Sequence, residues 1–147
     1  MSESPVELSV RMAGPSDTNT IYDLDERALQ DDDRRGFLWH ELRSGYVWIA
    51  ERDGSALGYA VASRNFYGYP FIELLKVRRD HRRQGTAGAL IAAIEAWVGS
   101  GKLFTSTNMS NLPMQRLCER LGFVPSGQID NLDEGDPELI YFKQLGS

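Results

Sequence analysis

The chain has 147 residues, of which 41% are hydrophobic and 25% charged, and its net charge of −5 gives a pI near 5.0. This length suits a single domain over residues 1–147, with residues 1–5 expected to be a short disordered lead-in. The acidic balance excludes general nucleic-acid binding, which needs a broad basic face. Without an apolar run of roughly 20 residues or a secretory signal, the chain is expected in the cytoplasm, with no membrane partner.

The first half of the chain is predicted to form a strand, two helices and a hairpin. Alternating apolar residues indicate a strand at 6–12, and Ser16 or Asp17 then caps a helix that runs to about Leu29. A second helix contains the apolar residues of 37–42. The turn signal Asp53-Gly54 joins two further alternating segments, which predicts a β-hairpin.

The second half alternates strands with helices. A fourth strand covers 71–77, and a helix with apolar residues at 90, 91, 94, 97 and 98 follows it. A fifth strand is predicted at 103–107, a helix from Asn111 to Leu121 that Gly122 ends, and short strands near Phe123 and over 139–145.

A glycine-containing loop connects the fourth strand to the next helix and predicts an anion site. Backbone N–H groups of such a loop approach a ligand closely, and the helix presents its positive end there. Arginines at 78, 79, 82 and 83 add positive charge. The residues expected to bind phosphates are Arg82, Arg83, Gln84, Gly85, Thr86, Ala87 and Gly88. A single cysteine and two distant histidines provide no zinc site, so no metal is expected.

Two motifs resemble the GNAT N-acetyltransferases. Arg82, Gly85 and Ala87 fit the acetyl-CoA signature [QR]-x-x-G-x-[GA] after a strand. The segment 108–123 resembles N-x-x-N-x-x-A-x-x-x-Y-x-x-x-G-F: Asn108, Asn111, Gly122 and Phe123 match, whereas Met114 replaces the small residue and Cys118 the tyrosine.

The resemblance implies an α/β fold of the GNAT type and acetyl-CoA as co-substrate. Its central mixed, twisted sheet has six to seven strands, flanked by about four helices, and its parallel fourth and fifth strands splay apart at one end. Backbone groups of Leu75, Lys76 and Val77 are then expected to hold the pantetheine and polarise the thioester carbonyl. Asn108 and Asn111 are expected to hold the pantetheine arm or to cap a helix, with Asn111 the better cap.

Glu73 is the candidate general base. Alternation places it on one face of the fourth strand with Phe71 and Leu75, and an alkylammonium must lose a proton before it can attack a thioester. Partial burial is expected to raise its pKa. The alternative is a rim carboxylate paired with Lys76 or an arginine.

Cys118 has two interpretations. It forms an apolar stripe with Met114, Leu117 and Leu121, so it is either a small core residue or, in place of the family's tyrosine, a proton donor to the departing CoA sulfur.

The sequence thus predicts an N-acetyltransferase that transfers an acetyl group from acetyl-CoA directly to a primary amine of a small molecule or peptide. A catalytically silent acyl-CoA sensor and a phosphate-binding interaction module are the alternatives. The acidic segments 31–33 and 130–138 are either solvated surface or attract a cationic amine. The acceptor's identity and a homodimer are left open.

Overall fold

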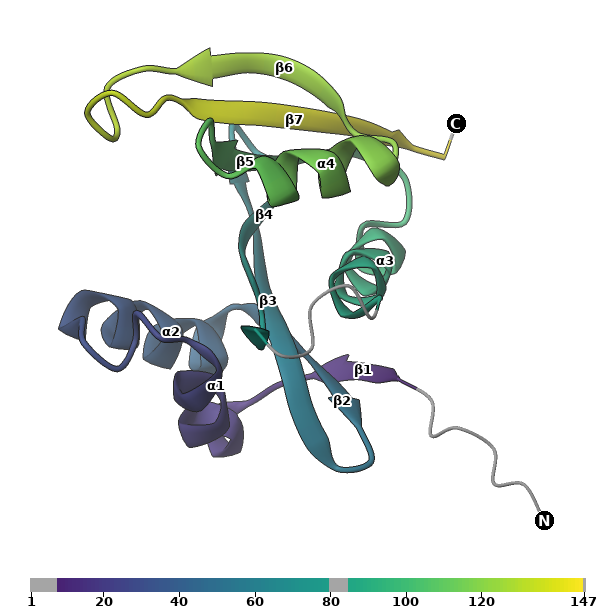
Figure 1. Ribbon diagram of the computed structural model, residues 1–147. Coiled ribbons are helices and arrows are strands. Elements are labelled where there is room, and N and C mark those ends of the chain that lie inside the picture. The colour runs from purple at the N-terminus through teal and green to yellow at the C-terminus, as the bar shows by residue number, and fades with distance from the viewer. Residues whose placement is uncertain (1–7, 80–84, 147) are drawn as a thin grey trace. The chain divides into compact units, whose positions relative to one another are not determined.

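The computed structural model describes residues 8–79 and 85–146, which form four α-helices and seven strands (Figure 1). The strands make one mixed sheet in the order β1-β2-β3-β4-β5-β7-β6, with β4 and β5 parallel, which confirms the predicted fold class. The elements in chain order are β1 (Ser9–Met12), a 3-10 turn (Pro15–Asp17), α1 (Thr18–Leu24), α2 (Asp32–Ser44), β2 (Tyr46–Arg52), β3 (Ser55–Phe66), β4 (Tyr69–Val77), α3 (Thr86–Val98), β5 (Gly101–Asn108), α4 (Leu112–Arg120), β6 (Val124–Ile129) and β7 (Glu138–Leu145).

The described residues divide into two compact units. The first comprises the chain up to Ala62 together with Leu74–Ala93, and the second comprises Ser63–Glu73 and the residues from Ile94 onward. The expected disordered lead-in at residues 1–5 lies outside the described residues. Every helix in the described part of the chain is too short or too polar to cross a bilayer.

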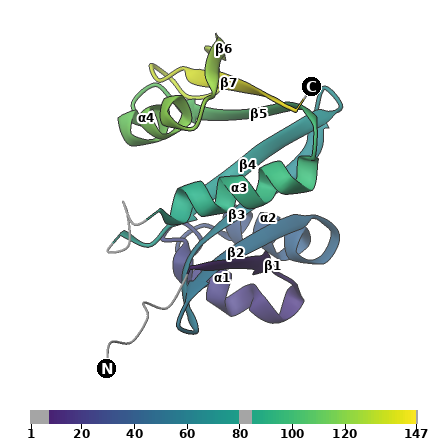
Figure 2. The ribbon, with the colours of Figure 1, turned by 90° about the vertical axis from the view of Figure 1, so that its right-hand side faces the viewer.

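The first unit is built on the β2–β3 hairpin. Asp53 and Gly54 both have positive φ, 54° and 77°, which is the turn geometry that matches strand twist, so the predicted hairpin is confirmed. Figure 1 and Figure 2 show α1 and α2 on one face of this hairpin and the start of α3 on the other.

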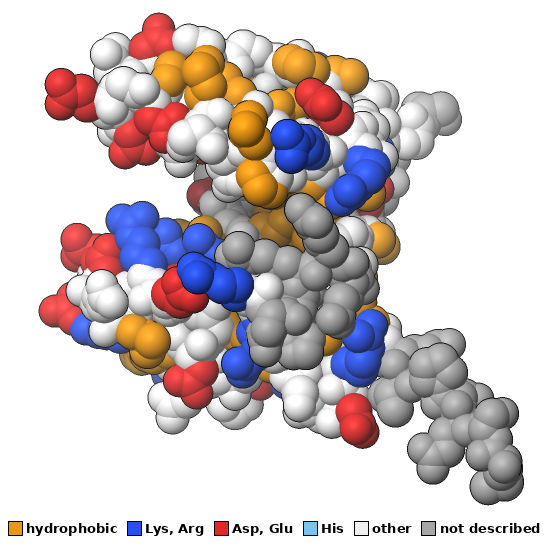
Figure 3. Space-filling model, viewed as in Figure 1, with side chains coloured by type: hydrophobic (Ala, Val, Ile, Leu, Met, Phe, Trp, Pro, Cys, Tyr) orange, Lys and Arg blue, Asp and Glu red, His pale blue; other side chains and the backbone are white. Residues whose placement is uncertain are grey.

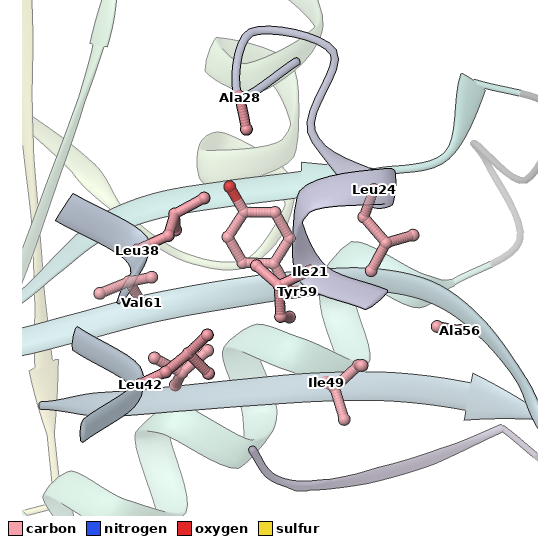
Figure 4. Close-up of a cluster of buried hydrophobic side chains, with 10 residues drawn as sticks. Ile21, Leu24, Ala28, Leu38, Leu42, Ile49, Ala56, Tyr59 and Val61 are labelled. Atoms are coloured by element: carbon pink, nitrogen blue, oxygen red, sulfur yellow. The ribbon is translucent and has the colours of Figure 1, made fainter. Parts of the chain in front are cut away.

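The core of the first unit lies between the hairpin and the first two helices (Figure 4). Each fully buried Leu, Ile or Val contributes about 1.5–3 kcal/mol by leaving water. The side chains drawn with labels are Ile21, Leu24, Ala28, Leu38, Leu42, Ile49, Ala56, Tyr59 and Val61.

The first helix is shorter than predicted. It ends at Leu24 rather than near Leu29, because the next residue, Asp25, adopts an extended conformation. The Asp25 carboxylate accepts hydrogen bonds from the backbone amides of Arg27 and Ala28 at 3.0 and 3.3 Å, which closes a turn in place of another helical turn.

The second unit contains β5, β7 and β6 as an antiparallel ladder, with the start of β4 beside β5. The register of β4 and β5 pairs Phe71 with Phe104 and Ile72 with Thr105. One face carries aromatic contacts among Phe66, Phe71, Phe104 and Phe142, with ring centroids 4.8–5.3 Å apart. Helix α4 packs on the other face through the fully buried Cys118.

Candidate functional site

A close approach of backbone segments fixes the start of α3 in the first unit. A Cβ on Gly58 of β3 would stand 2.7 Å from the carbonyl oxygen of Lys76 and 3.3 Å from Cγ2 of Thr86. Only glycine fits there without a shift, so Gly58 allows β4 and the first turn of α3 to pack on β3. The structure thereby brings two predicted segments together, Leu75–Val77 and Gly85–Gly88.

The N-terminus of α3 offers unpaired amides. Gly85 accepts the first helical hydrogen bond, from the amide of Ala89 at 3.0 Å, so the amides of residues 85–88 have no partner inside the helix. Gly85 has φ +81°, which favours glycine. Thr86 is only 1% exposed, so its side chain is enclosed at this helix start. Arg82, Arg83 and Gln84 lie outside the described residues.

A charged cavity of about 380 Å³ lies at the end of β4 in the same unit. Lys76, which lines it, has no ion-pair partner among the described residues, whereas Arg27 pairs with Asp31 at 2.9 Å. Figure 3 likewise shows basic and acidic side chains mixed over the α1–α2 part of the surface. The cavity is lined by Asp23, Leu24, Asp25, Glu26, Arg27, Lys76, Val77, Arg78 and Arg79.

A buried polar network holds one wall of this cavity. Asp25 is 1% exposed and accepts hydrogen bonds from the Tyr59 hydroxyl and from Nη1 of Arg34, the latter at 2.7 Å. Burial alone would raise the pKa of Asp25, but these two donors outweigh it and lower the pKa. Burial and the bond to Asp25 raise the pKa of Tyr59. The sequence pattern missed this network, although an acidic residue at position 25, on the inner face of the helix predicted to run to about Leu29, was a signal.

Glu73 belongs to the second unit and is exposed, so its predicted partial burial is wrong. It stands on β4 just beyond Ile72, the last residue in register with β5, so β5 no longer pairs with the strand at this position. Its Oε1 accepts a hydrogen bond from the Ser63 hydroxyl at 2.8 Å. Within the described residues Glu73 has no ion pair, so the predicted alternative of pairing with Lys76 or a described arginine is not seen.

The two asparagines have separate structural roles. Asn111 caps α4, since its side-chain oxygen accepts from the Met114 amide at 3.2 Å, as predicted. Asn108 instead donates to Asp133 at 2.9 Å and so anchors the acidic loop before β7. Asp136 in that loop accepts from Ser110, so part of the acidic segment is structural. Their predicted contacts with pantetheine stay predictions.

Cys118 is fully buried on α4, with 0% exposure. Burial, assisted by the nearby charge of Glu119, raises the pKa of its thiol to about 11. An enclosed thiol of this kind favours the core interpretation over a role at a substrate. The described residues contain no group of three or more His, Cys, Asp or Glu side chains placed to hold a metal ion.

Comparison with known proteins gives a consistent result. The profile of the acetyltransferase (GNAT) family matches residues 16–123. Over 79 residues the chain is 33% identical to an aminoglycoside N(6')-acetyltransferase type 1 of Serratia marcescens, a match that covers 52% of this chain and 48% of the relative. The chain thus spans about half the length of that curated relative.

Solved structures with the same fold cover nearly the whole chain. A GNAT-family acetyltransferase from Bacillus cereus ATCC 10987 superposes with a TM-score of 0.88 and 33% identity, over 96% of this chain and 99% of that one. The structure of yncA from Salmonella typhimurium with its cofactor acetyl-CoA has a TM-score of 0.72 at 20% identity, over 95% and 94% of the two chains.

Proposed function

Because the chain belongs to the acetyltransferase (GNAT) family, we propose that it is an N-acetyltransferase that transfers an acetyl group from acetyl-CoA directly to a primary amine. The acceptor is a small molecule or a peptide. The observation that carries the proposal is the start of α3, inside the segment that matches the family. Its first amides are unpaired within the helix, and Gly58 lies close both to Thr86 of this helix and to the end of β4.

Acetyl-CoA would be held in the first unit by backbone groups. The amides of Gly85, Ala87 and Gly88 suit the pyrophosphate, because unpaired amides at a helix start attract anions. Backbone groups of Leu75, Lys76 and Val77 would bind the pantetheine and polarise the thioester carbonyl. The unpaired Lys76 ammonium and the neighbouring Arg78 and Arg79, which line the cavity, add positive charge for the phosphates.

Glu73 would accept the amine proton. Its exposure and its lack of an ion pair among the described residues leave the carboxylate free to receive a proton, directly or through water. The Ser63 hydroxyl, 2.8 Å away, would orient it. The amine nitrogen then attacks the carbonyl carbon, and no acyl group is attached to the protein.

Two variants test how the cofactor is held. Gly85→Val should weaken CoA binding strongly, because a β-branched residue is strained at φ +81° and obstructs the phosphates. Arg79→Ala, the matched control, removes an exposed charge next to Glu26 and should cost about 1 kcal/mol or less. Calorimetric titration with CoA measures both, and equal losses would reject binding by the helix terminus.

Turnover tests the activity itself. Release of CoA in the presence of pooled small amines, amino acids and peptides should be detected for the wild type. Glu73→Gln should bind CoA normally but lower the rate at pH 7 about 100-fold, with partial recovery as rising pH deprotonates the amine. Binding of acetyl-CoA without any acetylated product would instead indicate an acyl-CoA sensor.

A further inference from the structure

The sheet of the second unit has one face that the helices of this unit leave open. Lys143 of β7 donates to Glu95 of α3 at 3.0 Å and to the carbonyl of Leu121, which follows α4. Lys143 pairs with Leu103 of β5, so the two residues share the face on which these helices lie. The alternate residues of β5 point to the opposite face, called here the open face. They are half-buried or exposed: Lys102, Phe104 and Ser106.

An apolar band crosses the open face. Phe104 pairs with Phe71 of β4 on one side and with Phe142 of β7 on the other, so the three rings share this face. All three are half-buried and keep accessible surface. Val124 of β6 pairs with Phe142, is 57% exposed, and extends the band to the edge of the sheet. An accessible apolar patch of this kind is typical of a binding surface.

Two glutamates lie on one side of this band. Glu73 follows Phe71 by two residues on β4, so alternation points both side chains to the open face. The Glu138 carboxylate of β7 accepts a hydrogen bond from the hydroxyl of Ser106, another residue of this face, at 2.8 Å. Neither glutamate has an ion-pair partner among the described residues. This side of the band therefore attracts an ammonium group.

A lysine lies on the other side of the band. Lys102 precedes Phe104 by two residues on β5, and its ammonium stands 5.0 Å from the ring centroid of Tyr69. Lys102 is exposed and forms no ion pair within residues 8–79 and 85–146. Its charge can therefore pair with an anionic group of a ligand.

The distance between the two charged sides sets the length of a matching ligand. Glu73 lies four residues after Tyr69, which contacts Lys102, on the same strand. At a rise of about 3.3 Å per residue, the separation is about 13 Å. An extended chain of about four residues spans the same distance from its amine to its carboxylate. Its two central side chains would then lie over the phenylalanine band.

We propose that the acceptor is a short peptide of about four residues, with apolar central side chains and a free C-terminal carboxylate, which binds along the open face. This inference rests on the proposed function, in which Glu73 takes the proton of the N-terminal amine. Lys102 binds the carboxylate, and Glu138 adds negative charge on the side of the amine. The face selects the acceptor and adds no chemical step to acetyl transfer.

The first test varies the peptide and leaves the protein unchanged. For a tetrapeptide with phenylalanine and leucine at its centre, kcat/KM should be about fivefold higher with a free than with an amidated C-terminus, the size expected for an exposed ion pair. A dipeptide should show no such advantage, because its carboxylate lies only about 7 Å from its amine. Serine at both central positions should lower kcat/KM of the tetrapeptide about tenfold through lost apolar contact.

The second test varies the protein. Lys102→Gln should raise KM about fivefold for the free tetrapeptide with kcat unchanged, and should not affect the amidated one. Arg116→Gln is the matched control: it removes an exposed positive charge from α4, on the covered face, and should leave both peptides unaffected. Val124→Asp should raise KM for the apolar tetrapeptide about tenfold, because it places a charge in the apolar band. Calorimetry should show unchanged CoA binding in all three variants.

Equal kcat/KM for the free and amidated tetrapeptides, or an equal loss with both in Lys102→Gln, would overturn this inference while leaving the proposed function intact. Acetylation of other amines but of no peptide would do the same. A Val124→Asp protein that changes from dimer to monomer with KM unchanged would identify a second copy of the chain as the occupant of the face, and would also overturn it. Binding of acetyl-CoA without acetylation of any amine would overturn the proposed function, and this inference with it.

Discussion

Two buried tyrosines, one in each compact unit, differ in what their hydroxyls do. Tyr59 is 0% exposed and donates to Asp25, which also binds Arg34, so every member of that network has a partner. Tyr141 is 3% exposed and has no hydrogen-bond partner among the described residues. The hydroxyl of Tyr59 therefore contributes a hydrogen bond to stability, whereas that of Tyr141 contributes none within the described residues.

Asp25→Asn should have the largest effect, because it leaves the Arg34 guanidinium in a nearly buried site without its counter-charge. We expect a loss of about 3–5 kcal/mol in the free energy of unfolding, measured by urea denaturation. A loss below 1 kcal/mol would mean that Tyr59 and Arg34 find other partners, and the contrast between the tyrosines would fail.

The same variant should change the response to acid. The pKa of Asp25 is lower in the folded than in the unfolded state, so its stabilisation is fully present above about pH 3.9 and is lost as pH falls from there through the folded value. Asp25→Asn should therefore lose less stability than the wild type over that acidic interval. Parallel slopes of the two proteins would contradict the assignment.

Tyr59→Phe should cost less, about 1.5–3 kcal/mol, the range for a hydrogen bond to a charged group. It keeps the ring packed in the core but leaves one acceptor site of Asp25 empty. Thermal unfolding measures the loss, and acetyl transfer per folded molecule is the control. A loss below 0.5 kcal/mol would show that the bond to Asp25 adds little, and the contrast between the tyrosines would fail.

Cys118→Ala should cost on the order of 1 kcal/mol through a small cavity next to Tyr141. The transfer rate should be nearly unchanged, since the thiol is fully enclosed. Unfolding and single-turnover rates measured on one preparation decide this. A loss of 100-fold or more in a folded sample would contradict the core interpretation and favour Cys118 as the proton donor.

Tyr141→Phe should have the smallest effect on stability, about 0.5 kcal/mol or less, because the hydroxyl it removes has no partner among the described residues. Differential calorimetry against the wild type tests this. A loss as large as that of Tyr59→Phe would reveal a hydrogen bond at the hydroxyl and would remove the contrast between the two tyrosines.

Local patterns predicted the fold well. The Asp53-Gly54 hairpin and the capping of α4 by Asn111 depend on residues that are neighbours in the chain, and both are confirmed. The predicted end of α1, near Leu29, was wrong because Asp25 is held by Tyr59 and Arg34. Only the folded chain brings these partners close to Asp25.

The sequence predicted the candidate site less completely than it predicted the fold. A stripe at helical spacing suggested that Cys118 belongs to the core, and its burial agrees. Alternation placed Glu73 on a face of β4, but its exposure depends on where the β5 register ends. Tyr141 carries no motif: its relation to Ile72 exists only through the pairing of β7 with β5, which the sequence does not state.

Helix α4 is fastened by its own local bonds at both ends. Asn111 caps its start, and at its end the amides of Gly122 and Phe123 donate to the carbonyls of Glu119 and Cys118, with Gly122 at φ +91°. These rings close between near neighbours, whereas the β5–β7 ladder must bring Gly101 to Leu145. During folding, α4 can therefore form before the strands that it covers are paired. Those strands can then pack against the helix as they pair.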